Sequence, residues 1–211
     1  MVLPTLDQAE ALLQWAEALN PTFWATHSRI AAHAARTIAT AAGMDGEAAY
    51  IMGLLHDIGR YEGWKHIRHI YAGYVVLMDK GYTDAARICI THSFALQDIK
   101  ACMGENDCTP EEYAVIVREL AAAQYDDYDR LIQLCDSLAG NPGVVLIEKR
   151  LLNVAMRYPP NDLIKASWQA RFDIMAHFEG LVTAHSGGDV EKSKGAVYRL
   201  FPDVATNTFD Y

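Results

Sequence analysis

Histidine and aspartate are the residues of this sequence whose types and spacing best suit chemistry with a metal ion. The stretch YIMGLLHDIGRYEG, residues 50–63, is an apolar run that ends in His56 and Asp57. Two ionisable side chains at the end of a buried segment are costly to desolvate unless something binds them. The stretch therefore raises the question of which partner they have.

Further candidate ligands are spread over other predicted helices. His27, His69 and His92 fall on three of them, and Asp136 lies late in a fourth, inside the apolar run LIQLCDSLAG. An ionised carboxylate buried there needs a cation or a hydrogen-bond donor. Helical bundles build metal sites from inward-facing imidazole and carboxylate groups on different helices. Such ligands suit iron, manganese, cobalt, nickel and zinc, so the pattern predicts a metal centre.

The elements that must position these residues follow from apolar spacing and capping signals. Helices are expected over residues 5–19, 24–43, 46–58, 65–81, 83–92, 109–124, 126–140, 143–158 and 161–185. Thr5 with Gln8, and Thr109 with Glu112, form capping-box patterns at two of the starts. Strand alternation is absent from the sequence. We therefore expect an all-α fold, a compact helical bundle, as a single domain over residues 1–211.

Composition limits the classes of partner. The chain has 211 residues, 51% of them hydrophobic, and a formal net charge of -9, which argues against a nucleic-acid polymer. No apolar run approaches the roughly 18 residues that cross a membrane, and the first residues lack a secretory signal pattern. The four cysteines form no C-x-x-C pair and no zinc-ligand spacing, which favours reduced thiols. We expect a cytoplasmic protein without a membrane partner.

The order and contexts of the polar residues resemble those of the HD-domain metal-dependent phosphohydrolases. That family has a first His, an adjacent His-Asp pair and a late Asp, and its binuclear members add two histidines before the late Asp. Here HSRIAAHAARTIA, LLHDIGR, HIYAGYVVL, ICITHSF and LIQLCDSLAG supply these positions in order. The resemblance covers roughly residues 24–140 and implies a bundle of the HD-domain type. Two additional C-terminal helices would form an extension over 141–185, with a surface tail over 186–211.

The six-ligand version of this pattern implies a binuclear centre. Two divalent ions, iron foremost or else manganese, cobalt or nickel, would be held by His27, His56, Asp57, His69, His92 and Asp136. By resemblance Asp57 would bridge the ions. His66 lies one turn from His69 on the same helix face, so the choice between these two stays open. A metal-activated hydroxide would attack phosphorus, which implies a hydrolase with His56 and Asp57 in catalytic positions.

Cations near the His-Asp pair favour a phosphate-bearing substrate. Arg60, Lys65 and Arg68 lie within nine positions of an otherwise acidic chain. Arg60 can bind a phosphate through two parallel hydrogen bonds and assist catalysis. Tyr128, in the run YDDYDR, is a candidate contact for a substrate base or ring. The expected substrate is a small phosphate ester or anhydride, namely a nucleotide or a dinucleoside polyphosphate.

Two other functions stay open at this point. Within the wider superfamily a similar ligand set occurs in di-iron oxygenases that act on a small polyol or phosphonate, and dependence on dioxygen separates them from hydrolases. The other is a non-catalytic HD domain that binds a nucleotide. The helices expected over 143–158 and 161–185 would either pack on the core or form the surface of a homo-oligomer, and the sequence does not choose between them.

Overall fold

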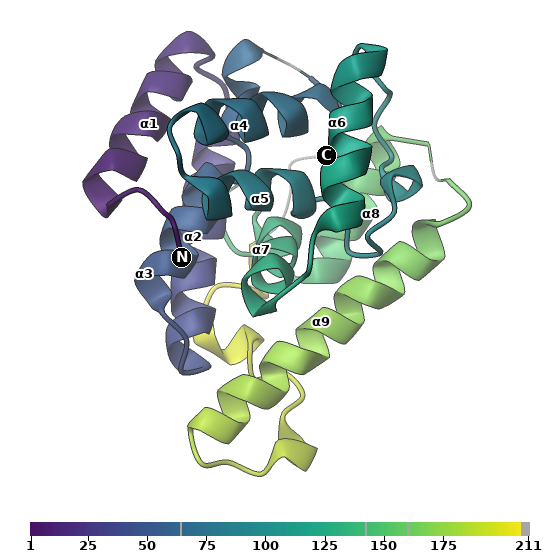
Figure 1. Cartoon of the computed structure of the whole chain (residues 1–211). Helices are drawn as coiled ribbons and strands as arrows, with labels where there is room; N and C mark the ends of the chain where they lie inside the picture. The colour runs from purple at the N-terminus through teal and green to yellow at the C-terminus, as the bar shows by residue number, and fades with distance from the viewer. Residues whose placement is uncertain (64, 142, 160, 208–211) are drawn as a thin grey trace.

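The fold is all-α, in agreement with the sequence. The computed structural model describes residues 1–63, 65–141, 143–159 and 161–207, and within these ranges it contains helices and an isolated β-bridge between Ala139 and Val144 but no strand. The α-helices are α1 (Leu6–Leu19), α2 (Trp24–Ala41), α3 (Gly46–Leu55), α4 (Arg68–Asp79), α5 (Thr83–Thr91), α6 (Pro110–Ala122), α7 (Asp127–Leu138), α8 (Ile147–Arg157) and α9 (Ile164–His185). Figure 1 shows them stacked into a bundle from which one end of α9 projects.

Small residues bring α2 and α3 together at the centre of the bundle. α2 is rich in alanine, and the alanines at 31, 32, 34 and 35 are buried. A Cβ built on Gly53 of α3 would lie 2.8 Å from the Cα of Ala32, closer than ordinary packing allows. The two backbones are therefore in direct contact. This contact places the start of α2 beside the end of α3.

The chain leaves the α-helical conformation earlier than expected after α3. The apolar pattern predicts a helix over 46–58, but α3 ends at Leu55. His56 caps it, and Asp57, with φ -107° and ψ 14°, leads into a short 3₁₀ helix, η1 (Ile58–Glu62). The prediction of the helix end was wrong because apolar spacing alone does not distinguish the last α-helical turn from a following 3₁₀ turn.

η1 packs closely against α4 through glycine. A Cβ at Gly59 would overlap the carbonyl of His69 and the backbone nitrogen of Gly73. Only a residue without a side chain lets the two backbones approach this far. As a result, the segment that carries Asp57 lies directly beside the start of α4, which carries His69.

The C-terminal helices pack on the bundle. Ile174, Met175, Phe178 and Val182 of α9 belong to the same hydrophobic cluster as buried residues of α2 and α7. Of the segment expected to form a surface tail, Ala196, Val197 and Val204 are also buried, and the 3₁₀ helices η3 (Val190–Lys192) and η4 (Tyr198–Leu200) form within it. Residues 208–211 of that segment lie outside the described residues.

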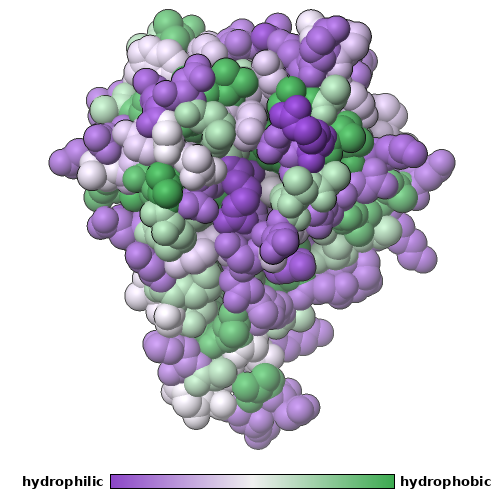
Figure 2. Space-filling view, viewed as in Figure 1, coloured by the Kyte–Doolittle hydropathy of each residue, from purple (hydrophilic) through white to green (hydrophobic). Residues whose placement is uncertain are grey.

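The surface is predominantly polar on the face shown in Figure 2, where hydrophobic residues form several small patches among hydrophilic ones. The cysteines at 89, 102, 108 and 135 are all free thiols. Throughout the described ranges, each helix is too short or too polar to cross a lipid bilayer.

Candidate metal centre

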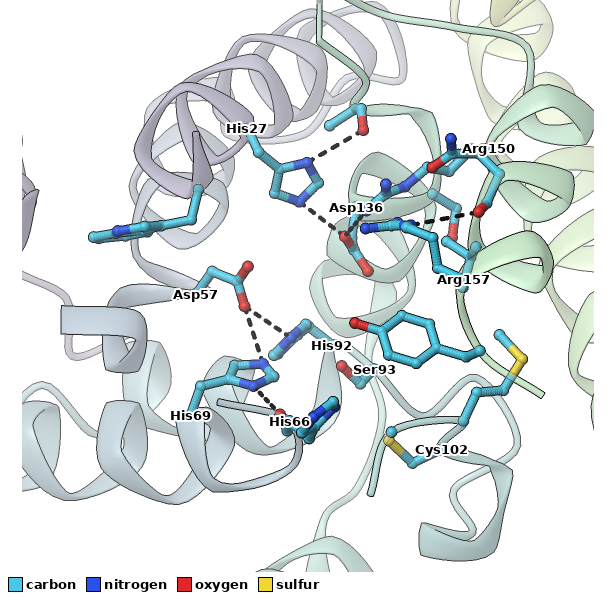
Figure 3. A pocket seen from close by; sticks show the side chains of 18 of the residues that line it. His27, Asp57, His66, His69, His92, Ser93, Cys102, Asp136, Arg150 and Arg157 are labelled. Carbon is cyan, nitrogen blue, oxygen red and sulfur yellow. Dashed lines mark hydrogen bonds and ion pairs between the residues drawn. The ribbon is translucent and has the colours of Figure 1, made fainter. Parts of the chain in front are cut away.

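The fold brings the six predicted ligands to one region of the bundle. They come from α2, the segment after α3, α4, the C-terminal end of α5, and α7. Five of them line one cavity of about 680 Å³: His27, Asp57, His69, His92 and Asp136. The sixth, His56, is buried, and its ring lies 5.4 Å from that of His27 and 5.0 Å from that of His92. Figure 3 shows the five cavity-lining ligands converging from different segments of the chain.

The carboxylate of Asp57 lies at the centre of the group. Its Oδ1 is 3.0 Å from Nε2 of His69 and 3.6 Å from Nε2 of His92, while its Oδ2 is 3.9 Å from Nε2 of His56. The potential ligand atoms form two sets, His27–His56–Asp57 and Asp57–His69–His92. Within each set, the atoms all lie within 4.8 Å of one another. Asp57 belongs to both sets, which is the position expected of a bridging carboxylate.

The four imidazole rings are oriented by backbone carbonyls. The Nδ1 atoms of His27, His56, His69 and His92 lie within hydrogen-bond distance of the carbonyl oxygens of Ala139 (3.2 Å), Gly53 (2.7 Å), His66 and Cys89 (2.9 Å), respectively. A carbonyl only accepts, so each Nδ1 carries the proton and donates it. Nε2 of His56 and Nε2 of His69 are then left with their lone pairs, as in histidines that bind metals.

Buried polar atoms without partners test whether a cation fits here. Nε2 of His56, Oδ1 of Asp57 and Nε2 of His69 are buried and accept no hydrogen bond from the described residues. Such atoms are rare in folded proteins, because desolvation without compensation is costly. All three atoms carry lone pairs and lie in the two sets around Asp57. The donor set therefore fits divalent metal ions, with imidazole nitrogen and carboxylate oxygen as ligands.

The electrostatics favour the ligating forms of His56, His69 and Asp57. Burial lowers the pKa of His56 to about 4 and also lowers that of His69, so both rings are neutral at pH 7. Burial alone would raise the pKa of Asp57, but Arg60 and the neighbouring imidazoles hold it well below the usual carboxyl value. In His92, burial is outweighed by the neighbouring carboxylate of Asp57, and its pKa is raised.

Arg60 and Asp136 complete the immediate surroundings of the centre. Nε of Arg60 donates to Oδ2 of Asp57 at 2.5 Å, and its Nη1 donates to the carbonyl of Lys65 at 3.2 Å. Oδ1 of Asp136 lies 3.0 Å from Nε2 of His27. Asp136 thus adjoins one of the two sets, and Arg60 holds the shared carboxylate in place from the other side.

The structure places some of the remaining candidates from the sequence in the cavity and others outside it. Lys65 lines the cavity, as does His66, whose backbone carbonyl orients His69. Arg68 is not among the lining residues and pairs with glutamates at 62 and 112. Tyr128 is not among them either, and its hydroxyl accepts from the backbone N–H of Asp45. The structure therefore does not bring Arg68 and Tyr128 into this cavity, and their contacts with a substrate stay predictions.

Three cavity arginines were missed by the sequence analysis. Arg150 and Arg157 of α8 lie across the cavity from Asp57 in Figure 3, and Arg171 of α9 lines the same cavity. On α8 the lining residues are 150, 151, 153, 154 and 157. Polar residues spaced by three and four positions share one face of a helix. This periodicity was the available signal for Arg150 and Arg157, whereas Arg171 has no comparable local signal.

We expect metal binding to stabilise the folded protein measurably. Free Mn²⁺ at about 100 times its dissociation constant adds about 2.7 kcal/mol of stability, which is roughly 5–10 °C in Tm for a chain of this size. The measurement is thermal unfolding of chelator-treated protein with and without added Mn²⁺. The Asp57→Asn protein is the control and should respond far less. An equal shift in both proteins would place the binding elsewhere.

Comparison with known proteins gives one match. The family model described as HD domain matches residues 24–141, which is more than half of the chain and includes all six predicted ligands. No curated protein and no solved structure matches the chain. The match ends before α8 and α9, so the wall that carries Arg150, Arg157 and Arg171 lies outside the part that the family model covers.

Proposed function

Since this chain belongs to the HD-domain family, whose members are largely metal-dependent hydrolases of phosphate compounds, we propose that it hydrolyses a phosphate ester or anhydride of a small molecule. A nucleotide or a compound with a polyphosphate chain is the proposed substrate. The observation that carries the proposal is the shared carboxylate of Asp57, which lies between two sets of histidine imidazoles.

The ligands support a centre for divalent cations, for which iron, manganese, cobalt and nickel are the candidates. Cations held there would supply charge neutralisation and an activated water for attack on phosphorus. The backbone carbonyls orient His27, His56, His69 and His92, so these rings need no rearrangement before binding. Arg60 fixes the Asp57 carboxylate through its Nε.

The charge of the cavity supports an anionic substrate. Among the described residues, its lining contains five Lys or Arg residues, at 60, 65, 150, 157 and 171, but only two carboxylates, at 57 and 136. Both carboxylates belong to the proposed ligand set. A chain with a formal charge of -9 thus has a positively charged pocket, and local charge of this kind attracts anions from solution.

The reaction class is tested by phosphate release under nitrogen. We expect purified protein loaded with Fe²⁺ or Mn²⁺ to release inorganic phosphate from at least one compound in a panel of nucleotides and sugar phosphates, at equal rates with and without dioxygen. Turnover that needs dioxygen and consumes it would instead identify an oxygenase. Metal binding and nucleotide binding without any turnover would identify a non-catalytic domain.

A further inference from the structure

The arginines of α8 and α9 form an unusual arrangement in the cavity wall. Arg171 is half-buried, and its guanidinium donates to Oγ of Ser137 at 3.1 Å, to the carbonyl of Ser93 at 3.3 Å and to Ser167. Ser93 and Ser137 directly follow His92 and Asp136 in the chain. α9 is therefore hydrogen-bonded to the residues next to two proposed metal ligands. The cation is held at the edge of the centre by neutral acceptors alone.

Arg150 is surrounded by charges of both signs, namely the Asp136 carboxylate and the neighbouring arginines. Its Nη2 is 3.8 Å from Oδ1 of Asp136, too far for a hydrogen bond, and none of its side-chain nitrogens donates to another described residue at hydrogen-bond distance. The side chain is 19% exposed. Burial, together with the nearby positive charges of Arg157 and Arg60, lowers the pKa of Arg150. An anion placed between these guanidinium groups would relieve their repulsion.

Arg157 extends the row towards the cavity mouth. It lies seven residues after Arg150, on the same face of α8, and is exposed. Its Nε donates to the carbonyl of Asn153 at 3.4 Å, which leaves both Nη groups without a partner in the described structure. Trp168 lines the same wall, and its buried indole N–H also lacks an acceptor there. The row thus offers several unused donors beyond the ligand set.

We propose that Arg150, Arg157 and Arg171 form a second anion subsite, which binds a negatively charged group of the substrate adjacent to the phosphate that is hydrolysed. This inference rests on the proposed function, since it assumes that the reacting phosphate lies at the metal centre. Guanidinium groups bind phosphate oxygens through paired, charge-assisted hydrogen bonds. The enzyme then prefers substrates with two linked anionic groups, such as a diphosphate, over monoesters with one.

The preference is measurable with a pair of ligands that the enzyme cannot cleave. Methylphosphonate carries one phosphonate group, and methylenediphosphonate carries two joined through carbon. Isothermal titration of the Mn²⁺-loaded full chain, at constant free Mn²⁺, gives both dissociation constants. We expect the diphosphonate to bind at least about tenfold more tightly, which is the usual contribution of one or more charge-assisted hydrogen bonds.

The Arg157→Gln protein tests which residues cause this preference. Because Arg157 is exposed and makes one long hydrogen bond, we expect the variant to fold and its ratio of the two affinities to fall towards one. Arg118→Gln, an equivalent change on the exposed face of α6, is the control and should keep the ratio. A ratio within twofold of one in the unaltered protein, or a ratio unchanged by Arg157→Gln, overturns the subsite.

Failure of the subsite and failure of the proposed function are distinguishable, because neither phosphonate is a substrate. A ratio that collapses in Arg157→Gln, in a protein that hydrolyses no phosphate compound, supports the subsite and removes the reaction. Phosphate release by a protein whose ratio is insensitive to Arg157→Gln supports the reaction and removes the subsite.

Discussion

Replacement of Asp57 by asparagine should abolish hydrolysis while the protein remains folded. Both sets of ligand atoms share this carboxylate, and a neutral amide is a weaker ligand for a divalent cation than a carboxylate. We expect kcat/KM for the best phosphate substrate to fall at least about a thousandfold, equivalent to about 4 kcal/mol of transition-state stabilisation. Metal content, measured by elemental analysis of the same samples, should fall with it.

A matched change on the surface separates this effect from a general effect of charge. Asp79, at the end of α4, is exposed, and Asp79→Asn removes the same charge away from the cavity. It should keep the metal content and activity of the unaltered protein. Circular dichroism of Asp57→Asn should retain the helical signal, since the substitution preserves the shape of the side chain. Full activity in a folded Asp57→Asn protein would refute the proposed centre.

Replacement of Gly59 by alanine should cause the largest loss of stability that a single methyl group produces in this protein. The added Cβ would overlap the backbone of α4 at His69 and Gly73, and backbone atoms of two packed elements cannot turn away as side chains do. We expect a loss of about 3 kcal/mol in the free energy of unfolding, or roughly 6–12 °C in Tm. Denaturant unfolding monitored by circular dichroism measures it.

Gly180 of α9 provides the matched control for this stability prediction. A Cβ at Gly180 would meet only Cγ1 of Val190, at 3.9 Å, which is ordinary contact. Alanine is also the better residue in a helix interior, by roughly 0.5–1 kcal/mol. Gly180→Ala should therefore be neutral or stabilising. If Gly59→Ala were equally harmless, η1 and α4 would have to separate without cost, contrary to the packing described.

Local signals were sufficient for the helices and for the residues of the candidate centre. The capping box of Thr5 with Gln8 and that of Thr109 with Glu112 form as the sequence predicts, because a cap depends on residues within one turn. His56 and Asp57 were identified because a buried charged pair conflicts with the apolar pattern around it. The end of α3 was placed too late, since α and 3₁₀ turns bury similar positions.

The position of Arg171 in the cavity wall depends on tertiary contacts that no local pattern encodes. In the sequence, Arg171 reads as one more charged residue of a long helix. Its partners at Ser93 and Ser137 lie 78 and 34 residues away. Arg68 shows the complementary effect. Its closeness to the His-Asp pair along the chain favoured a role at the site, whereas in space it pairs with Glu62 and Glu112 and does not line the cavity.

The hydrogen bonds of Arg171 have a consequence for how this protein should be divided. A fragment cut where the family match ends, at residue 141, would lose the apolar face of α9 from the main core as well as the guanidinium that braces Ser93 and Ser137. We therefore expect that the shortest fragment able to fold extends beyond residues 24–141, which the family model covers. Exchanging α8 and α9 between relatives would replace the proposed anion subsite and part of the hydrophobic core at the same time. A change of substrate preference made in this way would therefore also change the stability of the fold.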